Sequence, residues 1–149
     1  MGAFIFRSTA ATCGTVAREL LHIQANASVV LEIHQAKISF MTTASEQIGC
    51  ALAIAATTNL VGSTLTPVCI SGGATCLSTG YGISSSNATG LSYLDSAIVN
   101  TFQGYEFLPT PELRPRIKPA QRIVLRTDTT HPTDYPAEWW IKFVEIGNG

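Results

Sequence analysis

The sequence predicts an all-β domain, built as an antiparallel β-sandwich or jelly roll of about eight or nine short strands. Apolar residues recur with a period of two in segment after segment. Gly, Pro, Ser and Thr separate these segments as turn signals. The chain has 149 residues, the length of one domain, and no linker divides it. We therefore expect residues 1–149 to form a single β-sandwich domain with one core.

The expected strands follow one another along the chain. They lie at 4–7, 16–24, 29–41, 47–57, 65–70, 91–102, 105–108, 121–126 and 138–146, with 75–81 as a further candidate. The Ala-rich segment 47–57 also matches a helix, but its larger residues alternate with small ones, which favours a strand between two packed layers. Residues 109–119 contain several prolines and are expected to form an extended connector.

The longest strand, 29–41, changes its buried side along its length. Up to Gln35 one parity is apolar, and from Ala36 onward the other parity is apolar. A period of two that switches face within one run indicates a β-bulge or a strand that passes between two environments. We expect this strand to be kinked.

The segment 57–92 is rich in turn residues and contains no charged residue. A solvated loop of this length usually carries some charge. We therefore expect the segment to pack on a neighbouring molecule or to fold over its own sheet.

Composition points to a protein that is part of an assembly. Hydrophobic residues make up 46% of the chain and charged residues only 13%, with a formal net charge of −1. Such a surface is covered by small polar residues or by other subunits. The charge balance gives no bulk attraction to nucleic acid or to anionic lipid, and we expect neither a signal peptide nor a membrane span.

The four cysteines, Cys13, Cys50, Cys69 and Cys76, are expected to be reduced and partly buried, because the chain is long enough to fold without disulfides. Cys69 and Cys76 flank a Ser-Gly-Gly turn and are the one pair that could form a disulfide.

Two segments are candidate interfaces. Five of the nine basic residues fall close together, and in an extended chain Arg114, Arg116 and Lys118 share one side. Because no aromatic residues are interleaved, docking to an acidic protein surface is favoured over nucleic-acid binding. Residues 1–7 are expected to form an arm that adds a strand to a neighbour, the alternative being a first strand of the protein's own sheet. The candidate interface residues are Phe4, Ile5, Phe6, Arg7, Arg114, Arg116 and Lys118.

Motifs for catalysis, cofactors or metals are not found in the sequence. Glu32 and His34 share a strand face and could orient an imidazole, but an exposed polar pair is favoured. Asp128 and Asp134 could bind calcium, but a polar turn is favoured. We therefore expect no enzymatic activity, no cofactor, no metal and no small-molecule substrate.

Four motifs occur in a fixed order from about residue 20 to the end. They are Val30-Leu-Glu-Ile-His-Gln35, Gly62-Ser-Thr-Leu-Thr-Pro67, Phe102-Gln-Gly-Tyr-Glu-Phe-Leu-Pro-Thr-Pro-Glu-Leu-Arg-Pro115 and Phe143-Val-Glu-Ile-Gly147. In this order the chain resembles a family of small proteins encoded among the virion genes of tailed bacteriophages. It departs from that family at 41–46, where an acidic segment is expected.

The resemblance implies a virion structural protein, made in the bacterial host cytoplasm and located on the capsid surface. The leading hypothesis is a capsid decoration (cement) protein, a homotrimer that binds the major capsid protein between capsomers, with no nucleic acid or membrane as a partner. The alternative is a tail-associated module that binds a receptor or carbohydrate through its loops, for which Tyr81 and Tyr135 are the available loop aromatics.

Overall fold

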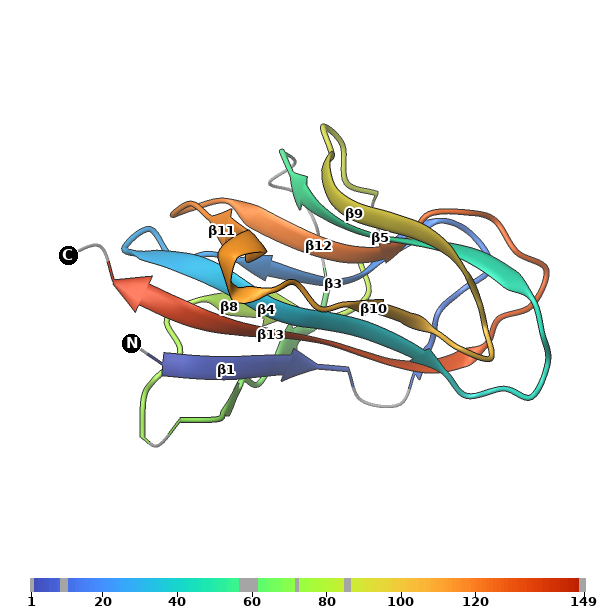
Figure 1. Ribbon diagram of the computed structural model, residues 1–149, viewed down its shortest axis with the longest axis horizontal. Coiled ribbons are helices and arrows are strands. Elements are labelled where there is room, and N and C mark those ends of the chain that lie inside the picture. The colour runs from blue at the N-terminus through green and yellow to red at the C-terminus, as the bar shows by residue number, and fades with distance from the viewer. Residues whose placement is uncertain (1, 9–10, 57–61, 72, 85–86, 148–149) are drawn as a thin grey trace.

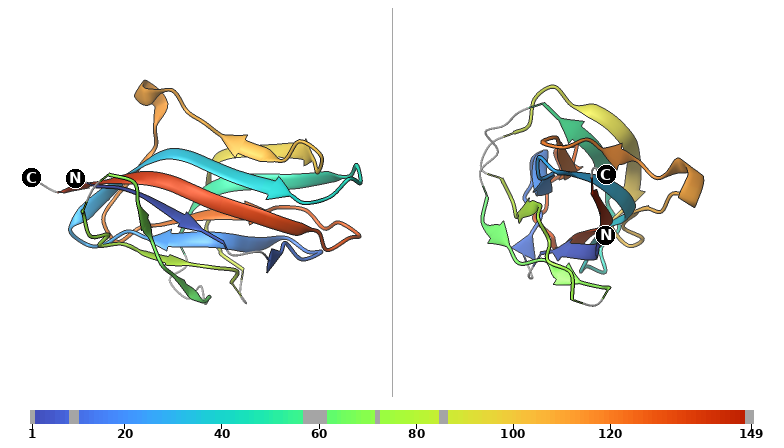
Figure 2. Two further views of the ribbon diagram at one scale, coloured as in Figure 1. Left: turned by 90° about the horizontal axis from the view of Figure 1, so that it is seen from below. Right: turned by 90° about the vertical axis from the view of Figure 1, so that its left-hand side faces the viewer.

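The computed structural model describes residues 2–8, 11–56, 62–71, 73–84 and 87–147. The protein is all-β, with two antiparallel sheets that face each other in a β-sandwich-like arrangement (Figure 1; Figure 2). Sheet A contains β1 (Gly2–Arg7), β2 (Ala11–Thr12), β4 (Val29–Phe40), β7 (Val68–Cys69), β10 (Tyr105–Phe107), β11 (Arg116–Ile117) and β13 (Pro136–Gly147). Sheet B contains β3 (Arg18–Gln24), β5 (Gln47–Ala55), β6 (Thr64–Leu65), β8 (Thr79–Tyr81), β9 (Ser92–Asn100) and β12 (Arg122–Thr127).

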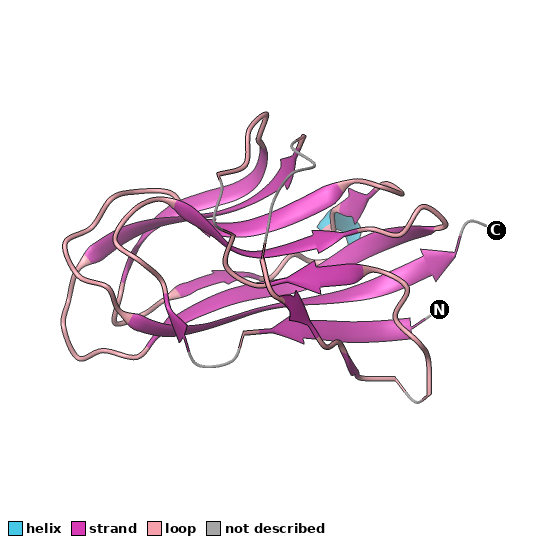
Figure 3. Cartoon of the chain, turned by 180° about the vertical axis from the view of Figure 1, so that it is seen from behind, coloured by secondary structure: helices cyan, strands magenta, loops and turns pink. Residues whose placement is uncertain are grey.

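The order of strands in sheet A is β10-β4-β13-β1-β7, with β11 also on β4 and β2 also on β13. In sheet B the order is β6-β8-β3-β12-β5-β9. Within the described ranges the helical structure is one 3-10 turn, η1 (Pro111–Leu113), in the proline-rich connector (Figure 3). None of the described residues belongs to a helix long and apolar enough to cross a membrane.

The all-β prediction is confirmed, but the number of strands differs. The described residues form thirteen strands, where eight or nine were expected. The difference comes from pairings of two or three residues, such as β2, β6, β7 and β11. Strands of two or three residues are too short for a period-two pattern to be recognised in the sequence.

The core lies between the two sheets. The ring of Phe143 packs against Phe4 and Phe6, with ring centroids 5.9 and 5.7 Å apart, and all three side chains are buried. Gly80 of β8 faces Phe6, and a Cβ at this glycine would lie 2.5 Å from the ring. Burying each such side chain contributes roughly 1.5–3 kcal/mol, so these contacts tie β1, β13 and β8 together.

The kink expected in the long strand is confirmed in β4. Along β13 the register passes from Lys142 opposite Gln35 to Phe143 opposite Ile33, so His34 is the extra residue of a bulge. Buried positions in β4 change parity at the same place. The bulge at His34 therefore explains why the apolar residues of this strand change from one parity to the other.

The strand interpretation of 47–57 is confirmed for Gln47–Ala55, which form β5. Ile48, Cys50 and Leu52 point into the core. On the other face Ala53 and Ala55 are also buried, in a second cluster with Val124 and Ala88. Small residues alternate with large ones because both faces of β5 are covered.

The expectation of a free N-terminal arm is corrected. Residues Gly2–Arg7 form β1, which pairs with β13 over its whole length and with β7 at Phe4 and Ile5. Phe4 is 1% exposed and Phe6 is fully buried. An arm that left the sheet would expose both rings, so the opening segment is a strand of the protein's own sheet.

The uncharged segment 57–92 adds three short strands to the protein's own sheets, although residues 57–61, 72 and 85–86 lie outside the described residues. β7 extends sheet A, while β6 and β8 extend sheet B. The carboxylate of Glu145 accepts hydrogen bonds from the amides of Leu77 and Ser78, at 2.7 to 3.1 Å. One buried acid on β13 thereby anchors the middle of this segment.

Candidate interaction surface

The outward side of sheet A carries large apolar side chains where solvent-facing strands usually carry polar ones. Every second residue of β13 from Ala137 to Glu145 is buried, so Trp140 and its neighbours of the same parity point outward. Ile5 lies opposite Val68 on one side and Lys142 on the other, and Arg7 lies opposite Trp140. We define the sheet A face as the outward side chains Ile5, Arg7, Val68, Trp140, Lys142, Val144 and Ile146.

A depression of about 190 Å³ lies on the sheet A face where β7, β1 and β13 run side by side. Ile5, Arg7, Val68 and Trp140 line it. Val68 is 57% exposed, whereas Ile5 and Trp140 are half-buried. An apolar hollow with an arginine at its side can take an apolar side chain together with an acidic group of another molecule.

At one edge of this face a single carboxylate holds three basic groups. Glu32 lies 3.1 Å from the imidazole of His34, 3.2 Å from Arg116 and 3.8 Å from Arg114. Burial alone would raise the pKa of Glu32, but the hydrogen bonds from His34 and Arg116, together with their charges, lower it below its ordinary value. Glu32 therefore stays ionised and compensates the arginines.

The basic edge expected from the sequence is corrected by this cluster. Arg116 lies opposite Glu32 in the pairing of β11 with β4, and Arg114 reaches the same carboxylate. Lys118 is exposed and is not part of the cluster. The connector consequently offers less free positive charge to an acidic partner than three adjacent basic residues suggest.

The structure divides the seven candidate interface residues. Ile5 and Arg7 belong to the sheet A face, Phe4 and Phe6 belong to the core, and the three basic residues lie at or beyond the β4 edge. Sequence reasoning missed Trp140 and Val68. A signal was present for Trp140, because both parities of 138–146 carry apolar residues, whereas a strand with one solvated face has only one apolar parity.

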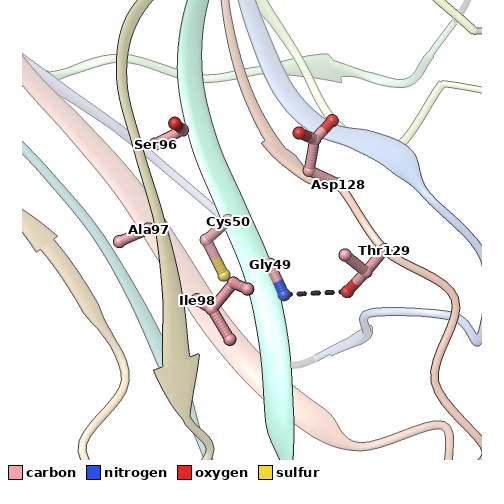
Figure 4. Close-up of a pocket in the computed structure, with 7 residues that line it drawn as sticks. All are labelled: Gly49, Cys50, Ser96, Ala97, Ile98, Asp128 and Thr129. Carbon is pink, nitrogen blue, oxygen red and sulfur yellow. Dashed lines mark hydrogen bonds between the residues drawn. The ribbon is translucent and has the colours of Figure 1, made fainter.

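A second hollow, of about 340 Å³, lies over β5 on the outward side of sheet B (Figure 4). Gly49 forms its floor and donates its amide to the hydroxyl of Thr129 at 2.8 Å. Asp128 supplies the carboxylate, but that group already accepts a hydrogen bond from Tyr93 and lies 3.5 Å from Arg126. The thiol of Cys50 is buried, and burial raises its pKa to about 12. These groups give the hollow no activated nucleophile and no uncompensated charge.

One cysteine does meet a histidine. The Sγ of Cys13 lies 3.5 Å from Nε2 of His131, whose Nδ1 lies 3.1 Å from the carbonyl oxygen of Thr129. Both side chains are buried, and burial, as the largest cause, raises the pKa of Cys13. The pair therefore joins two loops through a buried contact between a neutral thiol and an imidazole.

The other polar groups singled out in the sequence are separated. Asp128 contacts Arg126, whereas Asp134 accepts the amide of Gly14 at 2.6 Å. No cluster of three or more acidic, histidine or cysteine side chains that could hold a metal occurs among the described residues. Cys69 and Cys76 are free thiols that bond to the carbonyls of Ser71 and Ser78.

The two aromatics expected to favour a carbohydrate site each contact another side chain of the protein. Tyr81 stacks on His22, with ring centroids 4.7 Å apart, and Tyr135 is 6% exposed. The hydroxyl of Tyr135 donates to the carboxylate of Glu46. Tyr135 is therefore not exposed enough to stack on a sugar, whereas Tyr81 lies in β8 (Thr79–Tyr81) and is half-buried.

Comparisons of this chain with protein-family models, with curated protein sequences and with solved structures give no match.

Proposed function

We propose that the protein is a bacteriophage virion structural protein, a capsid decoration protein that binds the outer shell between capsomers and stabilises it. The observation that supports this proposal best is the sheet A face, where Trp140, Ile5 and Val68 surround a hollow beside Arg7. Tryptophan and arginine are enriched among the residues that dominate binding energy at protein interfaces. The partner is the major capsid protein, bound through an apolar side chain and a nearby carboxylate.

Composition supports the same proposal. A chain with 13% charged residues has few charges to spread over its solvent-facing surface. On a shell, many copies bind at equivalent sites, so each contact can be modest while the combined attachment is tight. The order of the sequence motifs resembles that of phage virion proteins and supports a virion as the setting, and we propose that the β-sandwich is a jelly roll.

The test is co-sedimentation of the purified protein with expanded shells that lack it. We expect saturable binding, and we expect Trp140→Ser to weaken it at least about tenfold, because the hollow loses its largest wall. Val16→Ser is the matched control, since Val16 is an exposed apolar residue at 55% exposure in a loop outside the sheet A face. Absence of binding by the unaltered protein, or equal binding by both variants, would contradict the proposal.

A further inference from the structure

The turn that joins β9 to β10, at the end of the sandwich opposite the two termini (Figure 1), carries the most exposed aromatic ring among the described residues. Phe102 is 73% exposed and lies just beyond β9, which ends at Asn100. A single exposed apolar side chain is common on protein surfaces and does not by itself indicate a site. Here the ring is held on a rigid turn and lies beside a polar hollow, and these two features together indicate a binding site.

Hydrogen bonds fix the backbone of this turn. The main-chain carbonyl of Asn100 accepts the amide of Gln103 at 3.0 Å, and its side-chain oxygen accepts the amide of Phe102 at 2.9 Å. The hydroxyl of the buried Thr101 donates to the carbonyl of Ala44 at 2.8 Å and ties the turn to the neighbouring loop. The backbone that carries the ring is therefore ordered before any partner arrives, which lowers the entropy cost of binding.

A hollow of about 350 Å³ lies beside the ring. It is lined by Phe102 and by three polar side chains that carry no charge, Ser45, Asn100 and Gln103. The amide nitrogen of Asn100 donates to the hydroxyl of Ser45 at 2.7 Å, which orients both groups. Amide and hydroxyl groups both donate and accept hydrogen bonds, so the hollow combines a flat apolar surface with groups that match the hydroxyls of a ligand.

The hollow over Gly49 (Figure 4) lies farther along the same outward side of β5 and β9. Gln47 lies opposite Asn100, and Gly49 lies opposite Ile98, so these four residues share one face of sheet B. From residue 100 to residue 96 this face is roughly 13 Å long at 3.3 Å per residue, the length of a short oligosaccharide. We define the β5–β9 trough as the outward residues Ser45, Gln47, Gly49, Ser96, Ile98, Asn100, Phe102, Gln103 and Thr129.

We propose that the β5–β9 trough binds a neutral oligosaccharide, with one sugar ring stacked on Phe102. One face of a pyranose ring carries mainly C–H groups and packs on an aromatic ring, whereas the hydroxyls at its rim need donors and acceptors. Asn100, Gln103 and Ser45 supply such groups beside the ring. The small side of the trough at Gly49 leaves room for the chain to continue along the sheet.

The lack of charge argues against the other classes of partner. None of the residues that define the trough is charged, and Asp128 at its border already contacts Arg126 and accepts a hydrogen bond from Tyr93. Nucleic acid and acidic glycans need cations at their phosphates or carboxylates. A protein partner favours an aromatic anchor within an apolar patch, whereas Phe102 shares its hollow with two amides and a hydroxyl.

This site does not rest on the proposed function. The two sheets face each other, so the trough on sheet B and the sheet A face point in opposite directions (Figure 2). A protein attached through the sheet A face would present the trough to the surrounding solution. The aromatic that carries the site, Phe102, is also neither of the two tyrosines that the sequence suggested for a carbohydrate site.

The test is affinity electrophoresis of the purified protein in native gels that each contain one polysaccharide. The neutral polymers are glycogen, dextran, galactomannan, arabinoxylan and glycol chitin, and polygalacturonate is the acidic comparison. We expect retarded migration in at least one neutral gel and none in polygalacturonate. Migration that no neutral polymer retards, or retardation by polygalacturonate, would overturn the proposal.

Variants at the ring separate stacking from a general apolar contact. Phe102→Ala and Phe102→Leu should both raise the dissociation constant for the retarding polymer at least about tenfold, whereas Phe102→Trp, which keeps a flat ring, should retain binding. Leu113→Ala is the matched control, since Leu113 is 74% exposed on η1 and lies outside the trough. Unchanged binding by Phe102→Leu, or equal losses in Phe102→Ala and Leu113→Ala, would overturn the proposal. Circular dichroism checks that each variant folds.

Discussion

His22 gives the sharpest prediction for stability. Its side chain is fully buried on β3, its ring stacks on Tyr81, and neither ring nitrogen has a hydrogen-bond partner among the described residues. Removal from water, together with the positive charge of Arg122, lowers the pKa of His22 from 6.5 to about 4. The folded protein therefore excludes a proton that the unfolded chain binds between these two pH values.

The sign and size of the effect follow from proton linkage. Because the unfolded chain binds more protons between pH 6.5 and 4, the free energy of unfolding falls as the pH falls through this window. With 1.36 kcal/mol for each unit of pKa difference, the contribution of His22 between pH 7 and pH 4 is a loss of roughly 3 kcal/mol. Above pH 6.5 the neutral imidazole adds no pH dependence.

The assay is urea unfolding at pH 7 and at pH 4 for the unaltered protein and for His22→Phe, which keeps an aromatic ring on Tyr81 and removes the titration. Taking the difference between the two proteins cancels the carboxylates that titrate in the same range. We expect the unaltered protein to lose roughly 3 kcal/mol more than the variant on acidification. A difference below about 1 kcal/mol would refute the burial argument.

Three further changes test the packing and the buried charges. Gly80→Ala should destabilise the protein by roughly 1–3 kcal/mol in urea unfolding, because the new Cβ would lie 2.5 Å from the ring of Phe6; unchanged stability would show that the ring can move aside. Glu145→Gln should lower the free energy of unfolding by roughly 1–3 kcal/mol and speed hydrogen exchange at the amides of Leu77 and Ser78, which donate to this carboxylate. Unaltered exchange would contradict its anchoring role. Arg126→Met should cost roughly 3–5 kcal/mol by leaving the fully buried Glu19 carboxylate without its cation, and adding Glu19→Gln should recover part of this loss; strictly additive losses would exclude the coupling.

The long strands could be predicted from the sequence because alternate residues of a strand lie on opposite faces of the sheet, so burial of one face produces an alternating apolar pattern. The change of parity at Gln35 predicted the kink of β4, since a residue's parity determines which sheet face it occupies. The alternation of large and small residues in 47–57 predicted a strand covered on both faces. A period-two pattern is enough to predict a strand wherever buried and exposed residues alternate over many positions.

Partners distant in the sequence could not be predicted in this way. The alternation of Phe4 and Phe6 shows that one face is buried but not whose sheet buries it, so an arm and a first strand give the same pattern. Arg116 and Glu32 lie far apart along the chain, and only the pairing of β11 with β4 brings them together. Val68 and Trp140 were not grouped with Ile5 for the same reason, because the three residues come from separate segments of the chain.

The proposed role of the protein is tested most directly by imaging particles with and without it at a resolution that locates single domains. The proposal predicts additional density on the outer shell between capsomers, with the sheet A face toward the shell. Density confined to the tail, or the same density in both particles, would contradict it.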